Sequence, residues 1–442
     1  MTNSPVHSSD NLAIPVSQKD RIVVLDSLRG FALLGILLMN IPYFGLPDPS
    51  FDILTLNNEM GTVNENVWFY VNLIFDGTQR GLFSLLFGGG ILLFISRLEV
   101  KIEGALPLEL FVRRQLWLIF FGLINAYVLL WPGDILFQYG IFGILLFLFR
   151  KQSVTFLCIA AFISLVLMTA RENIDLYRKK NIIVDGEAIA RIDTTKVSLT
   201  DIQKDKISEM MALKGESDTA ILRKKMKLNT DKCLSDYGTI YNFISPINAY
   251  IQFEFTYYRL WDVLLFIFLG MAFLKNGLLT GKGSVRVYFW MALVGWSIGL
   301  YLTYLHLRPR IEYQFNQYEI IKSLHFYFYE ISRSLRTIGM FGLLMLLYKA
   351  RIFNWFFTLL RPVGQMAFTN YLSQSFICNF IFLGIGLGMM GKVQRYELYY
   401  IVAGIWILQI IWSHLWLKRF RFGPMEWAWR SLTYWKRQPL RK

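Results

Sequence analysis

Charged residues, cysteine and histidine are all scarce in this chain of 442 residues. Asp, Glu, Lys and Arg together make up 17% of it, whereas hydrophobic residues make up 55% and the mean hydropathy is +0.40. Soluble domains typically contain about 25% charged residues. The composition therefore excludes an ordinary soluble protein and predicts a polytopic membrane protein.

The three cysteines, Cys158, Cys233 and Cys378, lie far apart, and two of them fall within apolar runs. Their spacing excludes a disulfide framework and does not match the ligand spacing of a metal site. We therefore expect neither a structural disulfide nor a bound metal.

Acidic residues are few, with 31 Asp and Glu against 46 Lys and Arg, which gives a net charge of +15. A basic excess is typical of nucleic-acid binding, but here the basic residues cluster at the ends of apolar runs. In that position they set the membrane orientation and contact anionic lipid head groups. We therefore expect membrane lipids, and not nucleic acid, as partners. The sequence does not decide between a monomer and a homodimer.

Long apolar runs are what the chain has in abundance. They predict an all-α fold with about ten transmembrane helices plus short interfacial helices. The predicted helices lie near residues 28–46, 80–97, 113–131, 134–150, 152–170, 259–275, 285–305, 323–348, 366–390 and 397–418. Segments 66–76 and 352–360 are too short to span a bilayer, so we expect them to be interfacial or re-entrant.

Basic residues divide the connections between these helices into two sets. Alternate connections are rich in Lys and Arg, and the intervening connections are poorer in them. The basic residues of the rich connections are Arg97, Lys101, Arg113, Arg114, Arg150, Lys151, Lys275, Lys282, Arg286, Lys349, Arg351 and Lys418. Because basic loops remain in the cytoplasm, both termini of this multi-pass protein are predicted to be cytoplasmic and the membrane to be an inner (cytoplasmic) membrane. No cleavable signal is evident, so we expect the first helix to be retained.

The chain divides into five predicted parts. They are a disordered cytoplasmic tail (1–20), an N-terminal membrane half of five helices (21–170), a polar extracytoplasmic insert (171–256), a C-terminal membrane half of five helices (257–420) and an amphipathic cytoplasmic tail (421–442). The insert is expected to be partly helical. It could cap an outward-facing site or be a variable decoration.

The first membrane helix begins with charge. Asp26 and Arg29 lie three residues apart, and Asn40 lies eleven residues beyond Arg29, so all three share one helix face. Such a row of polar side chains is unfavourable on a helix face that contacts lipid, because unsatisfied polar groups in hydrocarbon are costly. This face is expected to line a site inside the protein or, alternatively, to form a helix-end ion pair and one packing contact.

Five stretches carry a resemblance to a known family. They are LDSLRGFALLGILLMN (25–40), FSLLFGGG (83–90), WPGDILFQYG (131–140), VGQMAFTNYLSQS (363–375) and FGPMEWAWRSLTYWKRQPLR (422–441). Together they resemble the YeiB-like bacterial membrane proteins. Within the second stretch, residues 88–90 lie inside an apolar span, so close helix packing explains them better than phosphate binding.

The YeiB-like family is in turn distantly similar to transmembrane acyltransferases such as heparan-alpha-glucosaminide N-acetyltransferase and the acyltransferase-3 enzymes. That resemblance implies transfer of an acyl group from cytoplasmic acyl-CoA, such as acetyl-CoA, to an acceptor across the membrane. The acyltransferase-3 enzymes carry Arg, ten residues and then His on the first helix. Arg29 matches this Arg, but Asn40 stands at the position of the His, and residues 41–79 contain no His.

A general base for acyl transfer must therefore come from elsewhere. The chain has four histidines, His7, His306, His325 and His414. On a predicted helix over 323–348, His325 shares a face with Arg336, and Arg333 lies close by. The sequence thus nominates His325 as base and both arginines as ligands of an anionic substrate. Alternatively, the arginines form an internal ion-pair network with Glu330.

Further polar residues fall where they could complete a site. They are Asp134 and Asp76 as catalytic candidates, and Arg80, Asp262 and Asn370 as substrate-binding candidates. Asp134 or Asp262 could orient His325, but an Asp at the start of a helix is also an ordinary cap. Asn370 could equally serve helix packing.

Three functional interpretations follow. The first is an inner-membrane acyltransferase that uses acyl-CoA and modifies an envelope glycan, lipid or small molecule. The second is a transporter or flippase that carries an anionic lipid or metabolite through a polar intramembrane channel. The third is a non-catalytic scaffold, which would leave the cost of burying Arg333 and Arg336 explained by ion pairing alone.

Overall fold

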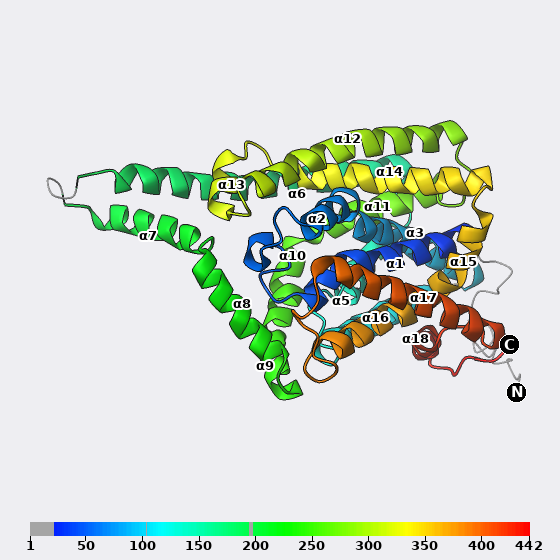
Figure 1. Cartoon of the computed structure of the whole chain (residues 1–442). Helices are drawn as coiled ribbons and strands as arrows, with labels where there is room; N and C mark the ends of the chain where they lie inside the picture. Colours follow the sequence, from blue (N-terminus) through cyan, green and yellow to red (C-terminus); the bar gives the residue numbers. More distant parts are fainter. Residues whose placement is uncertain (1–21, 103, 194–197) are drawn as a thin grey trace, which may run out of the picture.

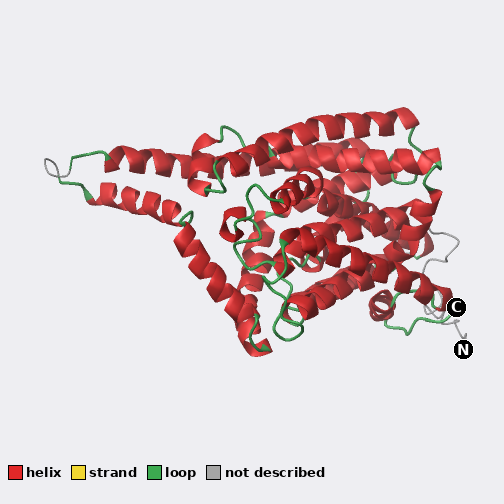
Figure 2. Cartoon of the chain, viewed as in Figure 1, coloured by secondary structure: helices red, strands yellow, loops and turns green. Residues whose placement is uncertain are grey.

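The computed structural model describes residues 22–102, 104–193 and 198–442. Helices account for nearly all of the regular structure in these ranges, and β-structure there is confined to an isolated bridge between Phe420 and Arg441 (Figure 2). The all-α membrane fold predicted from the sequence is confirmed. The predicted disordered tail, residues 1–20, lies outside the described residues.

Several helices are long and apolar enough to cross a membrane. In the described part of the chain five stretches meet this standard, namely Val23–Gly45, Val63–Lys101, Val154–Ala190, Val285–Glu312 and Arg395–Arg419. Two further helical segments, Tyr237–Tyr258 and Leu260–Lys275, meet it together but are bent by 64°. The total number of crossings stays a prediction.

Each of the ten predicted membrane helices has a helical counterpart. They are α1 (Val23–Gly45), α3 (Thr78–Lys101), α4 (Leu106–Tyr127), α5 (Leu136–Leu146), α6 (Val154–Ala190), α11 (Leu260–Lys275), α12 (Val285–Glu312), α14 (Tyr329–Ala350), α16 (Ala367–Phe382) and α17 (Arg395–Arg419). The two short predicted segments correspond to α2 (Val63–Phe75) and α15 (Asn354–Gln365), and the amphipathic tail contains α18 (Pro424–Tyr434).

The described part of the predicted insert is largely helical, and its predicted start at residue 171 falls within helix α6. Helix α6 continues without a break to Ala190 and is followed by α7 (Asp201–Gly215), α8 (Thr219–Cys233) and α9 (Tyr237–Ala249). Figure 1 shows the end of α6 and helix α7 projecting as a pair from the bundle, with α8 and α9 returning to it. Through π-helical residues Tyr250–Phe255 and α10 (Thr256–Tyr258), the chain then enters α11.

The predicted helix 323–348 begins later than expected. A short helix, α13 (Gln317–Ser323), precedes it, and α14 starts only at Tyr329. Residues 324–328 are held in a non-helical conformation by α6. Asn173 exchanges two hydrogen bonds with the backbone of Tyr327, and the Tyr177 hydroxyl donates to the His325 carbonyl oxygen at 2.8 Å. These tertiary contacts override the helical pattern.

Glycines allow α3 and α11 to pack with their backbones in contact. A Cβ atom added at Gly270 would lie 1.8 Å from the Leu85 carbonyl oxygen, and one at Gly88 would lie 2.3 Å from the Ile267 carbonyl oxygen. Small residues commonly permit such close approach between membrane helices. The predicted packing role of residues 88–90 is confirmed for Gly88 and for Gly89, which faces Gly270.

Replacing Gly270 with alanine is expected to destabilise the protein by about 1–3 kcal/mol, because the added methyl group forces α3 and α11 apart. Thermal unfolding in detergent or nanodiscs measures the effect. Gly404→Ala is the matched control, since nothing lies within 4 Å of its Cβ position, and alanine there should leave the melting temperature unchanged or raise it. Equal melting temperatures for the two variants would contradict the packing argument.

Candidate functional site

Two polar regions lie toward opposite ends of the bundle. One, which we call the arginine pocket, lies at the end where α15 and α18 pack, and the other lies near the insert (Figure 1). The arginine pocket has a volume of about 270 Å³. Its charged lining residues are Asp26, Arg29, Arg97, Arg114, Glu426 and Arg430.

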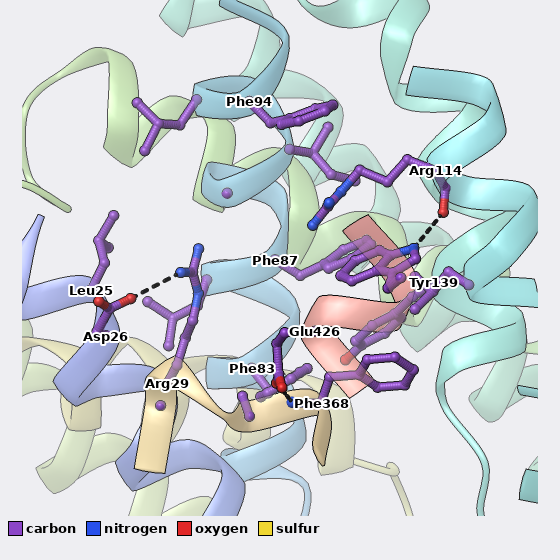
Figure 3. Close-up of a pocket in the computed structure, with 18 of the residues that line it drawn as sticks. Leu25, Asp26, Arg29, Phe83, Phe87, Phe94, Arg114, Tyr139, Phe368 and Glu426 are labelled. Carbon is purple, nitrogen blue, oxygen red and sulfur yellow. Dashed lines mark hydrogen bonds and ion pairs between the residues drawn. The ribbon is translucent and has the colours of Figure 1, made fainter. Parts of the chain in front are cut away.

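Helices from both halves of the chain build this pocket. Figure 3 shows Arg29 from α1 and Arg114 from α4 pointing into it between the aromatic rings of Phe83, Phe87 and Phe94. Gly90 makes room for Arg29, since a Cβ atom there would lie 2.6 Å from its Nη2 atom. Arg29 also pairs with Asp26 at 3.4 Å.

The C-terminal helix α18 closes one side of the pocket. The Arg114 guanidinium lies 3.6 Å from the centre of the Trp429 ring, and the Trp429 indole N–H donates to the Arg114 carbonyl oxygen at 2.9 Å. Glu426 accepts hydrogen bonds from the backbone N–H groups of Phe368 and Thr369 at the start of α16. Burial raises the pKa of Glu426, although the bonds from Thr369 and the backbone oppose this shift.

From the inner end of the pocket a chain of polar contacts, here called the polar ladder, leads toward the opposite end of the bundle. It consists of Tyr139, Ser84, Arg80, Asp262, Arg333 and Glu330.

The contacts of the ladder join α5, α3, α11 and α14. The hydroxyls of Tyr139 and Ser84 lie 2.6 Å apart, and the Ser84 hydroxyl donates to the Arg80 carbonyl oxygen. Arg80 pairs with Asp262 at 2.7 Å, and Asp262 also pairs with Arg333. Arg333 pairs with Glu330 at 2.5 Å. For Arg333, this is the internal ion-pair network that the sequence left open as the alternative to ligand binding.

Beyond the ladder lies the second polar region, which we call the His306 cluster and define as Asp76, His306, Tyr327, Tyr329 and Arg336. The Tyr329 hydroxyl donates to Asp76 Oδ1 at 3.2 Å. The His306 ring centre lies 4.7 Å from that of Tyr327 and 5.9 Å from that of Tyr329. Arg336 donates through Nη1 to the carbonyl oxygens of Asn72 and Leu73 at the end of α2.

The prediction that His325 shares a helix face with Arg336 is wrong. His325 lies before the start of α14 and is exposed, so no helical register links it to the arginines. Its role as a base stays a prediction without this geometric support.

The other predicted site residues divide between the two regions and the helix contacts. Arg29 lines the arginine pocket, Asp262, Arg80 and Arg333 lie in the ladder, and Asp76 and Arg336 lie in the His306 cluster.

Two of the remaining three residues hold helices together. Asp134 accepts from the Asn125 side chain and the Phe137 N–H, which places it at the start of α5 in the capping role considered from the sequence. Asn370 joins α16 to α17 through Ser413 and Trp412. Asn40 is half-buried on α1 and is not among the residues that line the arginine pocket.

Sequence reasoning missed Arg114, Arg430 and Glu426 as pocket residues. Arg114 was used only to assign the cytoplasmic side, and residues 421–442 were predicted only to be an amphipathic cytoplasmic tail. Sequence reasoning also left His306 at the end of a helix without a role. A signal for His306 exists in the sequence. Gly295, Gly299, Thr303 and His306 recur at helical spacing, and all of them are buried on one face of α12.

The described residues include no group of three or more His, Cys, Asp or Glu arranged to hold a metal ion.

Comparison with known proteins supports a family assignment. The family described as "Protein of unknown function (DUF418)" matches residues 273–436, a region that includes α12, α14 and α18. No solved structure matches the chain significantly.

Curated relatives match over nearly the full length. The chain is 31% identical to the uncharacterized protein YxaH of Bacillus subtilis, over 97% of this chain and 98% of that protein. It is 26% identical to the uncharacterized protein YeiB of Escherichia coli, over 94% of this chain and 96% of that protein. The family resemblance stated from the sequence is confirmed, and the chain belongs to the YeiB-like family of bacterial membrane proteins.

Proposed function

We propose that this protein is an inner-membrane acyltransferase whose donor site is the arginine pocket. It would take an acyl group from cytoplasmic acyl-CoA, with acetyl-CoA as the simplest donor, and pass it to an envelope glycan, lipid or small molecule. The observation that carries this proposal is an arginine-lined pocket with aromatic walls, in which the lining residue Tyr139 bonds to the buried Ser84 hydroxyl.

The two kinds of lining match the two parts of such a donor. Guanidinium groups bind phosphates through paired hydrogen bonds, and Arg29, Arg97, Arg114 and Arg430 supply four of them. Phe83, Phe87 and Phe94 supply an apolar wall for the acyl and pantetheine groups. A volume of about 270 Å³ is at the small end for ligand sites, so the nucleotide part would lie at the mouth, against α18.

The predicted topology directs the pocket toward the cytoplasm. Arg97 and the tail that follows Lys418 belong to the basic connections, which are expected on the cytoplasmic side, and α18 of that tail borders the pocket. The other end of the ladder and the insert then face the envelope. A membrane-crossing acyl transfer needs this arrangement, with the donor on one side and the acceptor on the other.

A second candidate function is transport of an anionic lipid or metabolite. The observation in its favour is the polar ladder, which buries Arg333, Asp262 and Glu330 between the two polar regions. Buried charges often mark a substrate path in membrane proteins. Transport would move an intact ligand across a vesicle membrane, whereas acyl transfer would release free CoA from acyl-CoA.

Binding of acyl-CoA tests the donor site. Acetyl-CoA, longer acyl-CoAs and free CoA are each expected to raise the melting temperature of the purified protein, because they bind the folded state alone. In Arg114→Ala, binding is expected to weaken at least about tenfold, since a charge-assisted contact is lost.

Arg113→Ala is the matched control. Arg113 lies next to Arg114 on α4 but pairs with Glu109 and contacts Trp435 instead of lining the pocket. Its shift with acetyl-CoA should equal that of the wild type. If no acyl-CoA shifts the wild-type melting temperature, the donor-site proposal is wrong, and transport becomes the leading candidate.

A further inference from the structure

The His306 cluster contains a buried histidine whose side chain is not fully satisfied. His306 is 6% exposed, and its Nδ1 atom has no hydrogen-bond partner among the described residues. Its ring lies against Tyr327 and Tyr329. Buried polar atoms in native proteins are nearly always hydrogen-bonded, so an unpartnered one indicates a place for a ligand or water.

Arg336, in the same cluster, also has N–H donors without hydrogen-bond partners among the described residues. It is fully buried, and its Nη1 atom donates to the carbonyl oxygens of Asn72 and Leu73. Its Nε and Nη2 atoms have no partner in the part of the chain that the structure describes. A buried guanidinium with two unused N–H donors is a ready site for an oxygen atom that carries negative charge.

Helix geometry brings these groups together. Gly299 and His306 lie two turns apart on one face of α12, and Tyr329 and Arg336 lie two turns apart on α14. Gly299 contacts the Arg336 side chain, and His306 contacts Tyr329. The two residues of α12 therefore each lie opposite one of the two residues of α14. The end of α2 then links them, since Asn72 binds Arg336 and Asp76 binds Tyr329.

The cluster is within reach of the donor pocket. Phe83 lines the pocket on α3, which begins at Thr78, two residues after Asp76 of the cluster, and the rise from Thr78 to Phe83 corresponds to roughly 7.5 Å. The extended thiol arm of CoA is longer than this. The interval is occupied by the polar groups of Arg80, Asp262 and Arg333.

We propose that the His306 cluster is the acceptor site of the acyl transfer, with His306 as the general base and Arg336 as the stabiliser of the developing oxyanion. This inference rests on the proposed acyltransferase function. The acceptor is a hydroxyl group, because a hydroxyl can donate a hydrogen bond to the unpartnered Nδ1 atom of His306 and so present its proton to the base.

The proposed reaction transfers the acyl group from the sulfur of CoA to the oxygen of the acceptor. His306 accepts the proton of the acceptor hydroxyl while its oxygen forms a bond to the thioester carbonyl carbon. Negative charge on the carbonyl oxygen is held by the free N–H groups of Arg336. The carbon–sulfur bond then breaks, CoA leaves as a thiolate, and the proton from His306 converts it to the thiol. The products are an ester and free CoA.

The test uses the purified full-length protein in nanodiscs with acetyl-CoA as donor. The acceptor probes are glycerol, glucose and N-acetylglucosamine, and release of the CoA thiol is measured. In His306→Gln, kcat is expected to fall at least about 100-fold, since general-base catalysis typically contributes that much. The melting-temperature shift with acetyl-CoA should stay at the wild-type value, because the donor pocket is intact.

His414→Gln is the matched control, because this histidine lies on α17, outside both the cluster and the arginine pocket, and its kcat should stay within about twofold of the wild type. If His306→Gln does not fold, His306→Asn is measured in the same way. Wild-type activity in a folded His306 variant, or donor binding without turnover of any probe, would overturn the acceptor site and leave the donor site standing. Absence of acetyl-CoA binding in the wild type would instead overturn both proposals.

Discussion

Replacing Asp262 with asparagine is expected to lower the free energy of unfolding by about 3–5 kcal/mol, because it leaves buried cations without their anion. Asp262 is 2% exposed and pairs with Arg80 and with the fully buried Arg333. Asparagine keeps the shape of the side chain and removes only the charge. Glu330 still pairs with Arg333 in this variant, but among the described residues no ion pair joins Glu330 to Arg80. Thermal or chemical unfolding in nanodiscs measures the change.

An exposed aspartate provides the control for this prediction. Asp231 lies on α8 and is exposed, so Asp231→Asn should change the free energy of unfolding by less than about 0.5 kcal/mol. If Asp262→Asn were as stable as this control, the ladder would not depend on ion pairing. The buried arginines would then have to be satisfied by water, as expected for a hydrated transport path.

The helices could be predicted from the sequence because the membrane imposes a simple rule. Every backbone polar group within hydrocarbon must be hydrogen-bonded, so long apolar runs become helices whatever their neighbours. The start of α14 could not be predicted in this way. It is set by Asn173 and Tyr177 on α6, which bind residues 325 and 327 about 150 positions later in the chain.

The candidate site was predictable only where a charge stood alone in an apolar run. Arg333 and Arg336 were identified because burying a guanidinium is costly. Arg29 was identified by the polar face that it shares with Asp26 and by its match to the Arg of the acyltransferase-3 enzymes. Partners close in sequence, such as Glu330 for Arg333, were identifiable, but Asp262 from a distant helix was not. The same holds for Trp429 in the tail, on which Arg114 stacks. From the sequence, Glu426 was only one residue of the predicted amphipathic tail. The fold shows that its side chain binds the start of α16.

Arg395→Ala is expected to destabilise the protein by about 3–5 kcal/mol, because it strands a buried carboxylate. Arg395 is 1% exposed, pairs with Glu59 at 2.8 Å and donates to the carbonyl oxygens of Ser50 and Phe51. These contacts fasten the loop between α1 and α2 to the start of α17. Arg419→Ala, at the exposed other end of α17, is the control and should change stability little.

The pH dependence of this variant gives a second, independent check. Burial raises the pKa of Glu59 and the Arg395 charge opposes that shift, so the pKa of Glu59 should rise further in Arg395→Ala. A carboxyl with a raised pKa in the folded state favours folding more as it becomes protonated. The stability gap between variant and wild type should therefore narrow as pH falls from neutral toward the ordinary pKa of a glutamate. A gap that stays constant over this range would show that the lost backbone contacts of Arg395, and not the stranded charge of Glu59, cause the destabilisation.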